Sequence, residues 1–421
     1  MSRYFAPANS ITQMQVTGEI PADRLTWLSE KLTANAFQSI EETLDEASMG
    51  WVQTENIDDS TFESPIAYAR DHYALFTLRS DQRRVATPIL RTHVIREEKK
   101  YLSENPNLRR VPKAVKEEIN ERVKLKLLAK TQPMPTFIDI AWDLDSGVVS
   151  VFSASTAAID KFETVFRKSF EGLHLTLIHP LARAKGVVVR NYGLLEALVA
   201  ADQSGSDDVT AQIKGNSWIG HDFLLWLLHR GIEITQDHTV NLPGHNKSGI
   251  KFGAWIDEKI EMAGSGGGGE AQRVMVNGSQ DCYREVKSAL TMGKQVTSAT
   301  IYLEMAENQW KITLDSLFFT FKSFRSPGIQ VEKDTPVDEM SAIEAVFFEK
   351  IYLIESGLQC FDSLLLEFLI VRLGTTWNDT LADIQAWAET IGETENRSAA
   401  VLADGDDWGD AGDEKDYIPD Q

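Results

Sequence analysis

The residues with the clearest chemical potential are the arginines and lysines gathered between positions 79 and 130. This stretch holds 15 Lys and Arg against 7 Asp and Glu, a net charge of +8. The whole chain of 421 residues carries −21, so the other 369 residues carry −29. Positive charge clustered on an acidic protein is typical of a surface that binds a polyanion. Composition alone leaves a second interpretation equally open, namely two solvated helices of mixed charge.

The cations expected to contact phosphates are spread along this stretch. They are Arg83, Arg84, Arg91, Lys99, Lys100, Arg109, Arg110, Lys113, Lys116 and Lys124. Contacts of this kind position a nucleic acid by its backbone and carry no information about its base sequence. Binding should therefore weaken steeply with salt, because each neutralised phosphate releases counterions.

Two helices must position these cations. Pro88 suits the first turn of a helix, where a missing N–H costs nothing, and Asn105-Pro106 ends that helix. Pro112 opens a second helix that runs to about Ala129. Its apolar residues recur every four positions and form one seam, made of Val115, Ile119, Val123 and Leu127. Beside the seam lie Lys113, Lys116 and Lys124. The pattern predicts a bent helical arm with an apolar side and a basic edge.

Three carboxylates at even spacing suggest a different chemistry. Asp139, Asp143 and Asp145 would share one face of a strand and could hold a divalent metal, as in a nuclease. The competing interpretation is the solvent face of a β-hairpin. The buried face would then comprise Ile138, Ile140, Trp142 and Leu144. We favour the hairpin, because the alternation fits it without a further assumption.

The remaining motifs do not indicate an active site. The glycine run at 266–269 has no strand before it and no Lys-Ser or Lys-Thr after it, so it is not a phosphate-binding loop. The aromatic residues between 218 and 227 have helical spacing and are expected in the core. The histidines at 221, 229, 238 and 245 and the two cysteines, Cys282 and Cys360, lack metal-ligand spacing. We expect no catalytic residue, no metal and no cofactor.

Strands and amphipathic helices interleave without strict alternation, which predicts an α+β fold with mixed sheets and packed helices. We divide the chain into an N-terminal α+β part (1–78), the basic helical arm (79–135), a hairpin–helix α+β part (136–202), a segment with short strands and a Gly-rich loop (203–280), a second hairpin with C-terminal helices (281–392) and an acidic tail (393–421). The tail holds 10 Asp and Glu against 2 Lys and Arg, which predicts disorder. A further interpretation is that it competes with DNA for the arm.

Two features of composition bear on location. No apolar run reaches the ~18–20 residues that span a bilayer, and the N-terminal residues have no apolar signal-peptide core. Two cysteines are few, which fits a reducing compartment. The sequence therefore predicts a cytoplasmic protein.

The arm and its flanks resemble the recombination-associated RdgC family. The resemblance begins at Ala36-Phe37 and the turn at 48–52, and it continues through Arg84-Val85 and Thr87-Pro88. Within and after the arm it is carried by Glu97-Glu98, Arg109, Lys113, Lys116, Ile119, Glu121, Val123, Leu127-Leu128, Pro133, Pro135, Trp142 and Gly147. Further along it is carried by the run 166–170 and by Gly293-Lys294 with Val296-Thr297. The segment 203–278 and the acidic tail depart from the family pattern.

This resemblance implies a homodimer closed into a ring, with a positively charged hole that takes single- or double-stranded DNA without sequence preference. It also implies a nucleoid-associated protein that restrains recombinase filaments of the RecA type and is not an enzyme. The residues themselves leave two alternatives open. One is a metal-dependent nuclease using Asp139, Asp143 and Asp145, and the other is an acidic interaction protein or DNA mimic, which the charge of −21 would suit.

Overall fold

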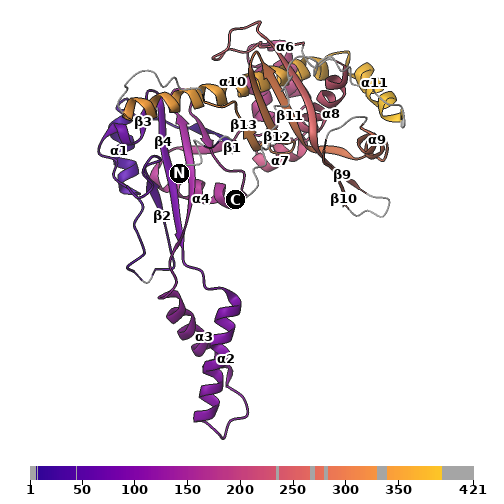
Figure 1. The fold of residues 1–421 in the computed structure, drawn as a ribbon. Helices are drawn as coiled ribbons and strands as arrows, with labels where there is room; N and C mark the ends of the chain where they lie inside the picture. The colour runs from indigo at the N-terminus through magenta and orange to yellow at the C-terminus, as the bar shows by residue number, and fades with distance from the viewer. Residues whose placement is uncertain are drawn as a thin grey trace, which may run out of the picture.

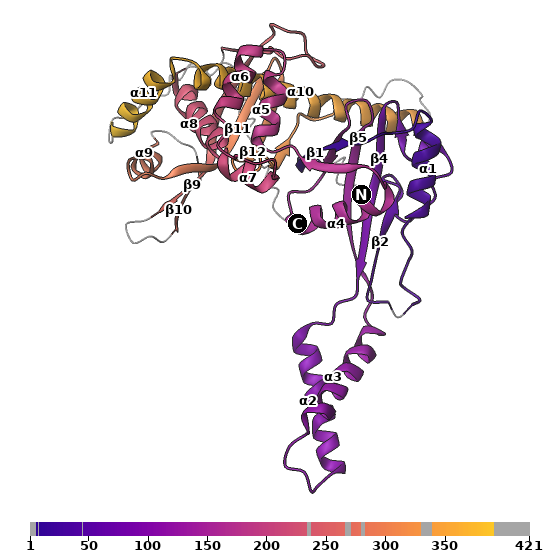
Figure 2. The same ribbon diagram turned by 180° about the vertical axis from the view of Figure 1, so that it is seen from behind.

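One antiparallel sheet runs through the computed structural model, and helices cover its faces (Figures 1 and 2). The structure describes residues 6, 8–43, 45–233, 237–265, 271–278, 283–329 and 339–390. Its strands are β1 (Ala8–Thr17), β2 (Ala47–Val52), β3 (Ala69–Arg70), β4 (Tyr73–Gln82), β5 (Met134–Asp143), β6 (Val148–Val151), β7 (His174–Leu177), β8 (His238–Thr239), β9 (Lys251–Ser265), β10 (Ala271–Val276), β11 (Gln295–Met305), β12 (Asn308–Asp315) and β13 (Phe321–Arg325). Its helices are α1 (Arg24–Ala34), the 3₁₀ helix η1 (Pro65–Ala67), α2 (Thr87–Glu104), α3 (Lys113–Leu128), α4 (Thr156–Ser169), α5 (Pro180–Val188), α6 (Tyr192–Ala200), α7 (Val209–Gly215), α8 (Trp218–Glu233), α9 (Arg284–Thr291), α10 (Glu339–Leu373) and α11 (Trp377–Glu389).

The strands join in the order β10-β9-β11-β12-β13-β1-β6-β5-β4-β2. β1 links the two halves of this sheet, because its first residues pair with β13 and its later residues pair with β6 and β7. All the named strand pairs are antiparallel. The α+β fold class is confirmed, whereas the expected mixture of parallel and antiparallel strands is wrong. Tight turns such as Gly147 and Ala306 connect neighbouring strands here, and such turns can only join antiparallel ones.

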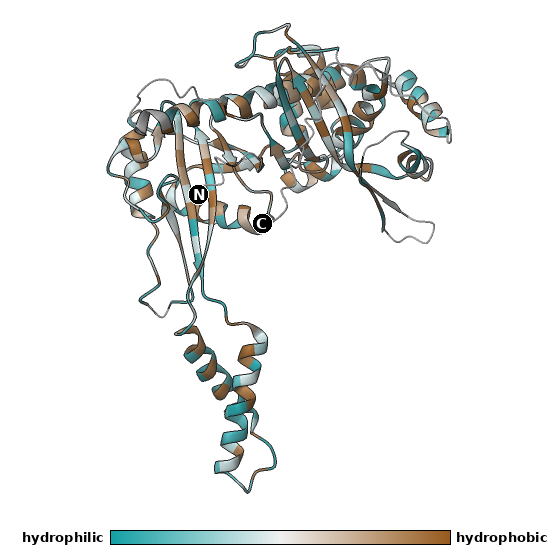
Figure 3. Ribbon diagram, in the orientation of Figure 1, coloured by the Kyte–Doolittle hydropathy of each residue, from teal (hydrophilic) through white to brown (hydrophobic). Residues whose placement is uncertain are grey.

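Each half of the sheet has its own hydrophobic core. In the first half Trp51, Trp142 and Phe76 meet α4, which inserts Phe162 and Phe166. α4 buries Phe162, Val165 and Phe166 on one face, and Phe170 at its C-cap is buried as well. In the second half α8 and α10 cover β9, β11 and β12. The two halves of the sheet and the helices that cover them form the body of the molecule. Figure 3 shows hydrophobic residues concentrated in this body and hydrophilic ones over the far end of α2.

The 35-residue helix α10 runs along both halves of the sheet (Figure 1). It contacts the first half through Glu355, which accepts a hydrogen bond of 2.6 Å from the Tyr73 hydroxyl. It contacts the second half through Asp362, whose carboxylate pairs with both Nε and Nη2 of Arg183 at 2.5 and 3.2 Å. The two halves are therefore held to one rigid element as well as to the shared strand β1.

A connecting segment, 238–246, is fastened along α10 at every fourth residue of the helix. Glu367 contacts His238 at 2.7 Å, and Ser363 accepts from the backbone N–H of Asn241 at 3.2 Å. Gln359 donates to the carbonyl of Leu242 at 2.7 Å. Positions four apart share one helix face, so this segment covers a single side of α10.

The two long strands β4 and β5 lead to the arm. Their ladder pairs Tyr73 with Asp143 at one end and Gln82 with Met134 at the other. Beyond that last pair the chain continues into α2 and α3, which project from the body as a helical hairpin (Figures 1 and 2). The predicted helices on either side of Asn105-Pro106 are confirmed.

Several predicted elements have different bounds. Residues 251–265 form one strand of 15 residues and not short strands, because β9 continues through its charged run with a bulge at Glu258, whose φ is 61°. The second hairpin ends at Asp315, and Phe321 begins the separate strand β13. The short helices α5 and α7 were not predicted. The Gly-rich run and the acidic tail lie outside the described residues.

The predicted core helix at 218–227 is confirmed. Phe223, Leu224 and Leu227 are fully buried, and Trp226 is nearly so. Among the helices that the structure describes, none combines the length and the hydropathy needed to cross a bilayer.

The joint between β1, β13 and α10 contains a buried lysine that makes stability depend on pH. Lys350 is 2% exposed and donates to the Ala6 carbonyl at 2.9 Å and the Ser326 hydroxyl at 2.8 Å. Burial lowers its pKa from 10.5 to about 8. Between these pH values the unfolded chain holds more protons than the folded chain, so this group makes stability rise with pH.

We predict that Lys350→Met removes this contribution. Urea melts at pH 7, 8.5 and 10 give the unfolding free energy of the parent and of Lys350→Met. The parent should gain stability relative to the variant as the pH rises. Using a difference cancels the titrations that both chains share. A difference independent of pH would contradict the assignment.

Candidate nucleic-acid interface

The arm is a helical hairpin whose ends follow from its prolines. Pro88 lies in the first turn of α2, and the N–H of Asn105 bonds the Leu102 carbonyl where that helix ends. Pro112 occupies the N-cap of α3. The connection between the two helices, residues 105–112, is short and reverses the direction of the chain. α2 and α3 therefore pack side by side.

A small core of its own holds the arm together. Val94, Ile119 and Val123 are buried where the helices meet, and the residues packed around them are Leu90, Tyr101, Val111, Val115 and Leu127. The apolar seam predicted for α3 is thus confirmed. Because this cluster is separate from the two body cores, the arm depends on α2–α3 packing and on the β4–β5 ladder for its position.

Nine of the ten predicted phosphate-contacting residues are exposed. They are Arg84, Arg91, Lys99, Lys100, Arg109, Arg110, Lys113, Lys116 and Lys124. Further exposed cations of the arm were not among the predicted residues, namely Arg96, Arg122, Lys126 and Lys130. These four residues were counted in the net charge of the stretch. They were not predicted as phosphate contacts, because their helical positions did not place them beside the apolar seam.

Arg83 is the exception. It is 6% exposed, and its guanidinium donates to the carbonyls of Ile40, Glu41 and Thr43 at 2.7 to 2.9 Å. It ties the 40–43 segment to the end of β4 and does not face solvent. Its neighbour Arg79 is also structural, since it pairs with Asp81 and Asp58 and covers the Phe37 ring.

Two ion pairs across the hairpin define its two faces. Lys116 pairs with Glu98 at 3.0 Å on one side, and Arg122 pairs with Glu97 at 3.7 Å on the other. With about 100° per residue, each helix position can be assigned to one of these sides. The side of the Lys116–Glu98 pair, called here the cationic face, carries Arg91, Lys99, Lys113, Lys116 and Lys124 against two acids, Glu98 and Glu117. The opposite side, called here the mixed face, carries Lys100 and Arg122 together with Glu97, Glu104, Glu118 and Glu121.

Carboxylates neutralise the cationic face only in part. Lys116 pairs with Glu98, and Lys124 pairs with Glu46 of the body at 3.0 Å, but both lysine side chains stay about half exposed. The Lys113 side chain is 93% exposed and lies 3.9 Å from Glu117. Exposed pairs of this kind are worth only ~0–1 kcal/mol, so a phosphate can displace the carboxylate.

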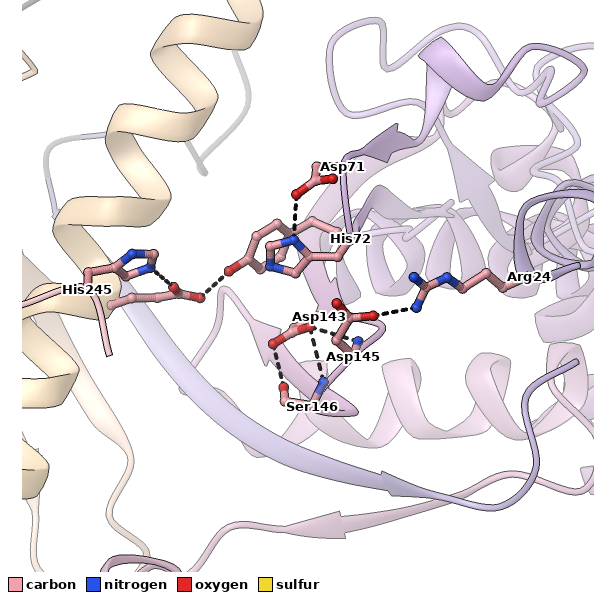
Figure 4. Close-up of polar contacts among 9 residues, drawn as sticks. Arg24, Asp71, His72, Asp143, Asp145, Ser146 and His245 are labelled. Atoms are coloured by element: carbon pink, nitrogen blue, oxygen red, sulfur yellow. Dashed lines mark hydrogen bonds and ion pairs between the residues drawn. The ribbon is translucent and has the colours of Figure 1, made fainter. Parts of the chain in front are cut away.

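The three evenly spaced aspartates do not converge. Asp139 is 1% exposed and accepts a hydrogen bond of 2.7 Å from the Thr77 hydroxyl. Asp143 caps the β5–β6 turn by accepting from the backbone N–H groups of Asp145 and Ser146, and Asp145 pairs with Arg24 at 2.6 Å (Figure 4).

Neither sequence interpretation of these aspartates is fully right. Ile138, Ile140, Trp142 and Leu144 are buried as the hairpin interpretation requires. Asp139, however, is not on a solvent face, because it lies beside Thr77, which is itself buried and bonded to the buried Thr54. Over the described ranges no group of three His, Cys, Asp or Glu residues is placed to hold a metal ion.

The histidines and the described cysteine have structural surroundings. His238 and His245 pair with Glu367 and Glu355 of α10, and burial lowers the pKa of His221. Cys360 is fully buried, which raises the pKa of its thiol to about 12 and keeps it protonated. Cys282 lies outside the described residues.

Comparison with known proteins gives one family. The family model described as "Putative exonuclease, RdgC" matches residues 11–187, which contain the first half of the sheet, the whole arm and most of α5. No curated protein matches the chain. The match therefore covers the part of the molecule that presents the cationic face.

The contrast between two neighbouring arginines is testable. Arg83→Ala removes a buried donor from three carbonyls, so we expect it to lower the free energy of unfolding by about 3 kcal/mol. Arg84→Ala removes an exposed side chain and should change it by less than ~0.5 kcal/mol. Urea denaturation of both variants decides the matter. Equal stability losses would contradict the structural role of Arg83.

Proposed function

Because residues 11–187 belong to the RdgC family, we propose that this chain is a non-enzymatic, sequence-independent DNA-binding protein that modulates homologous recombination. The observation that carries the proposal is the cationic face of the arm, with five cations on one side of an exposed helical hairpin. Family membership fits a role related to recombination. The residues assigned to DNA are the five cations of the cationic face together with Arg84, Arg109 and Arg110, because Lys100 lies on the mixed face and Arg83 is buried.

The dimensions of the arm suit a nucleic-acid backbone. α3 has 16 residues, which at 1.5 Å per residue gives a length of about 24 Å. Duplex DNA rises about 3.4 Å per base pair, so this face matches about seven base pairs. The contacts available are point charges on flexible side chains, which favours backbone binding over base reading.

A strongly acidic protein is expected to repel DNA, and the position of the arm reduces this repulsion. At physiological salt the Debye length is about 8 Å, so exposed charges further apart hardly interact. The distal cations of the arm are carried away from the anionic body by α2 and α3, which project from it (Figure 2) and are about 27 and 24 Å long at 1.5 Å per residue. A phosphate chain at the tip is therefore attracted locally and repelled little.

We further propose that two copies close into a ring around DNA. Encirclement would slow dissociation by geometry, so a modest contact energy would suffice. A ring on a strand would also obstruct the extension of a RecA-type filament along it. The resemblance of the arm and its flanks to the family supports this part of the proposal.

The proposal includes binding without cleavage, although the matching family is described as an exonuclease. The candidate metal ligands Asp139, Asp143 and Asp145 are separated by burial, turn capping and an ion pair. Incubation of end-labelled DNA with Mg²⁺ or Mn²⁺ tests this directly. Cleavage that disappears in Asp143→Ala would overturn it.

The decisive binding test compares the two faces of the arm. The double variant Lys99→Glu/Lys113→Glu should weaken duplex binding by at least ~10-fold and reduce the slope of log K against log[salt] by about 2, because each lost contact contributes ~0.9. The matched control Lys100→Glu/Arg122→Glu makes the same charge change on the mixed face and should have a much smaller effect. Equal effects of the two doubles would contradict the assignment of the cationic face.

A ring makes a separate prediction. Protein loaded on covalently closed circular DNA should resist a wash at ~1 M salt, whereas protein on linear DNA of equal length should slide off. Light scattering of the loaded fraction should give a dimer. Equal loss from both DNA forms would refute encirclement and leave simple binding in place.

A further inference from the structure

Helices cover one face of the second half of the sheet. The side chains buried beneath α8 and α10 include Ala254, Ile301 and Ile312. Figure 2 shows α5, α6 and α8 in front of β11 and β12, whereas Figure 1 shows the strands in front of these helices. Because side chains alternate along a strand, the sequence neighbours of the buried residues point to the face seen in Figure 1, called here the outer face.

Four side chains of the outer face lie in one row across four strands. The register pairs Trp255 of β9 with Tyr302 of β11. It then pairs Tyr302 with Lys311 of β12, and Lys311 with Arg325 of β13. Neighbouring strands lie about 4.8 Å apart, so this row extends over about 14 Å. It places two aromatic rings beside two cations.

The side chains of the row are ordered against one another and accessible. The rings of Trp255 and Tyr302 are nearly parallel, with an angle of 8° and 5.4 Å between their centroids. The Lys311 ammonium lies 5.5 Å from the centre of the Tyr302 ring. Arg325 is exposed and the other three side chains are half-buried. A cross-strand aromatic pair stabilises a sheet by itself, but it needs no cations beside it.

One carboxylate holds the middle of the row. Glu258 lies in the bulge of β9 and accepts hydrogen bonds from the Tyr302 hydroxyl and the Lys311 ammonium. The bond with Lys311 lowers the pKa of Glu258 and raises that of Lys311, so both groups stay charged at neutral pH. Arg325 pairs with none of the carboxylates that the structure describes, so its charge is available to a ligand.

From this row we infer that the outer face is a second nucleic-acid site, which binds single-stranded nucleic acid by its bases. Unpaired bases stack on Trp255 and Tyr302, and the adjoining phosphates lie beside Lys311 and Arg325. Aromatic rings with neighbouring cations on a sheet are a surface on which two or three unpaired bases can stack. A duplex cannot use the row, because its bases already stack on one another.

This inference goes beyond the proposed function, which assigns DNA to the arm alone, and does not depend on it. The two sites differ in chemistry, because the arm offers charges to a backbone and the row offers rings to bases. Stacking tolerates any base, so the row should show little sequence preference. Each ring is expected to contribute roughly 5- to 150-fold in affinity.

The first experiment removes the rings in a protein whose arm is already reversed in charge, Lys99→Glu/Lys113→Glu, called here the arm-reversed protein. A fluorescent dT oligomer of about 15 nucleotides is titrated and followed by anisotropy. The arm-reversed protein should still bind it, and adding Trp255→Leu/Tyr302→Leu should weaken binding by at least ~10-fold. The same leucine pair in the parent should leave duplex affinity and the unfolding temperature nearly unchanged, which excludes a folding defect. Unchanged oligomer affinity after loss of both rings would overturn the inference.

The charges of the row have their own matched control. Arg325→Glu in the arm-reversed protein should weaken binding of the dT oligomer, whereas Arg190→Glu makes the same change at the end of α5 and should have little effect. Glu258→Gln keeps an acceptor for Tyr302 and removes a negative charge, so it should raise affinity about threefold. Equal effects of the two arginine variants, or lower affinity in Glu258→Gln, would contradict the placement of phosphates beside Lys311.

A change of ligand separates stacking from charge. An oligomer of the same length with abasic sites has the same phosphates and no bases, so it should bind the arm-reversed protein at least ~10-fold more weakly than dT. A uridine oligomer offers the same bases on ribose and, compared with dT, shows which sugar the row prefers. Equal affinity for the abasic and dT oligomers would overturn the inference.

Photocrosslinking locates the bases on the parent protein. A strand that contains 5-bromodeoxyuridine should crosslink to the peptides that contain Trp255 or Tyr302. Crosslinks confined to the arm would overturn the inference.

These experiments distinguish the row from the proposed function of the arm. If binding of the dT oligomer depends on Lys99 and Lys113 and not on the rings, the function stands and the row is wrong. If oligomer binding depends on the rings and the parent binds no duplex, the row stands and the DNA-binding function of the arm is wrong.

Discussion

Separation of charge is the constraint on which this molecule depends. A chain with a net charge of −21 repels nucleic acid unless its cations are gathered and held away from the carboxylates of the body. Screening limits the reach of those carboxylates to about 8 Å at physiological salt, whereas α2 and α3 are about 27 and 24 Å long. The α2–α3 hairpin projects from the body, and the net charge of +8 between residues 79 and 130 sits mostly on it.

The rest of the structure explains how a thin hairpin can be held out in solvent. The arm's own core, with Val94, Ile119 and Val123 as its buried members, is too small to fix the direction of the arm alone. The direction comes from β4 and β5, which are paired over ten residues from Tyr73 to Gln82 and are anchored in the first core by Trp142 and Phe76. Arg83 closes this base by binding three carbonyls of the 40–43 segment. The one buried member of the predicted cation set thus supports the arm and does not face solvent.

The sequence predicted the arm well because local signals dominate there. Prolines mark the helix ends, and apolar residues every four positions mark the seam, so neither feature depends on the distant chain. Burial of Arg83 and Asp139 was not predictable in the same way. Arg83 is satisfied by carbonyls some 40 residues earlier, and Asp139 by Thr77 on a neighbouring strand. Likewise, β9 was missed as one long strand because its charged centre at Asp257–Glu261 hides a bulge that only pairing with β11 stabilises.

The most direct test of the account removes the arm and leaves the body intact. Since Gln82 faces Met134, Arg83 can be kept opposite Pro133 and residues 84–132 replaced by Asn-Gly, which favours a two-residue hairpin turn. The account predicts that this chain unfolds at nearly the parent temperature, because neither body core includes arm residues, and that its duplex affinity falls by at least ~100-fold with a salt slope near zero. Full DNA affinity in the armless chain would show that the binding surface lies elsewhere.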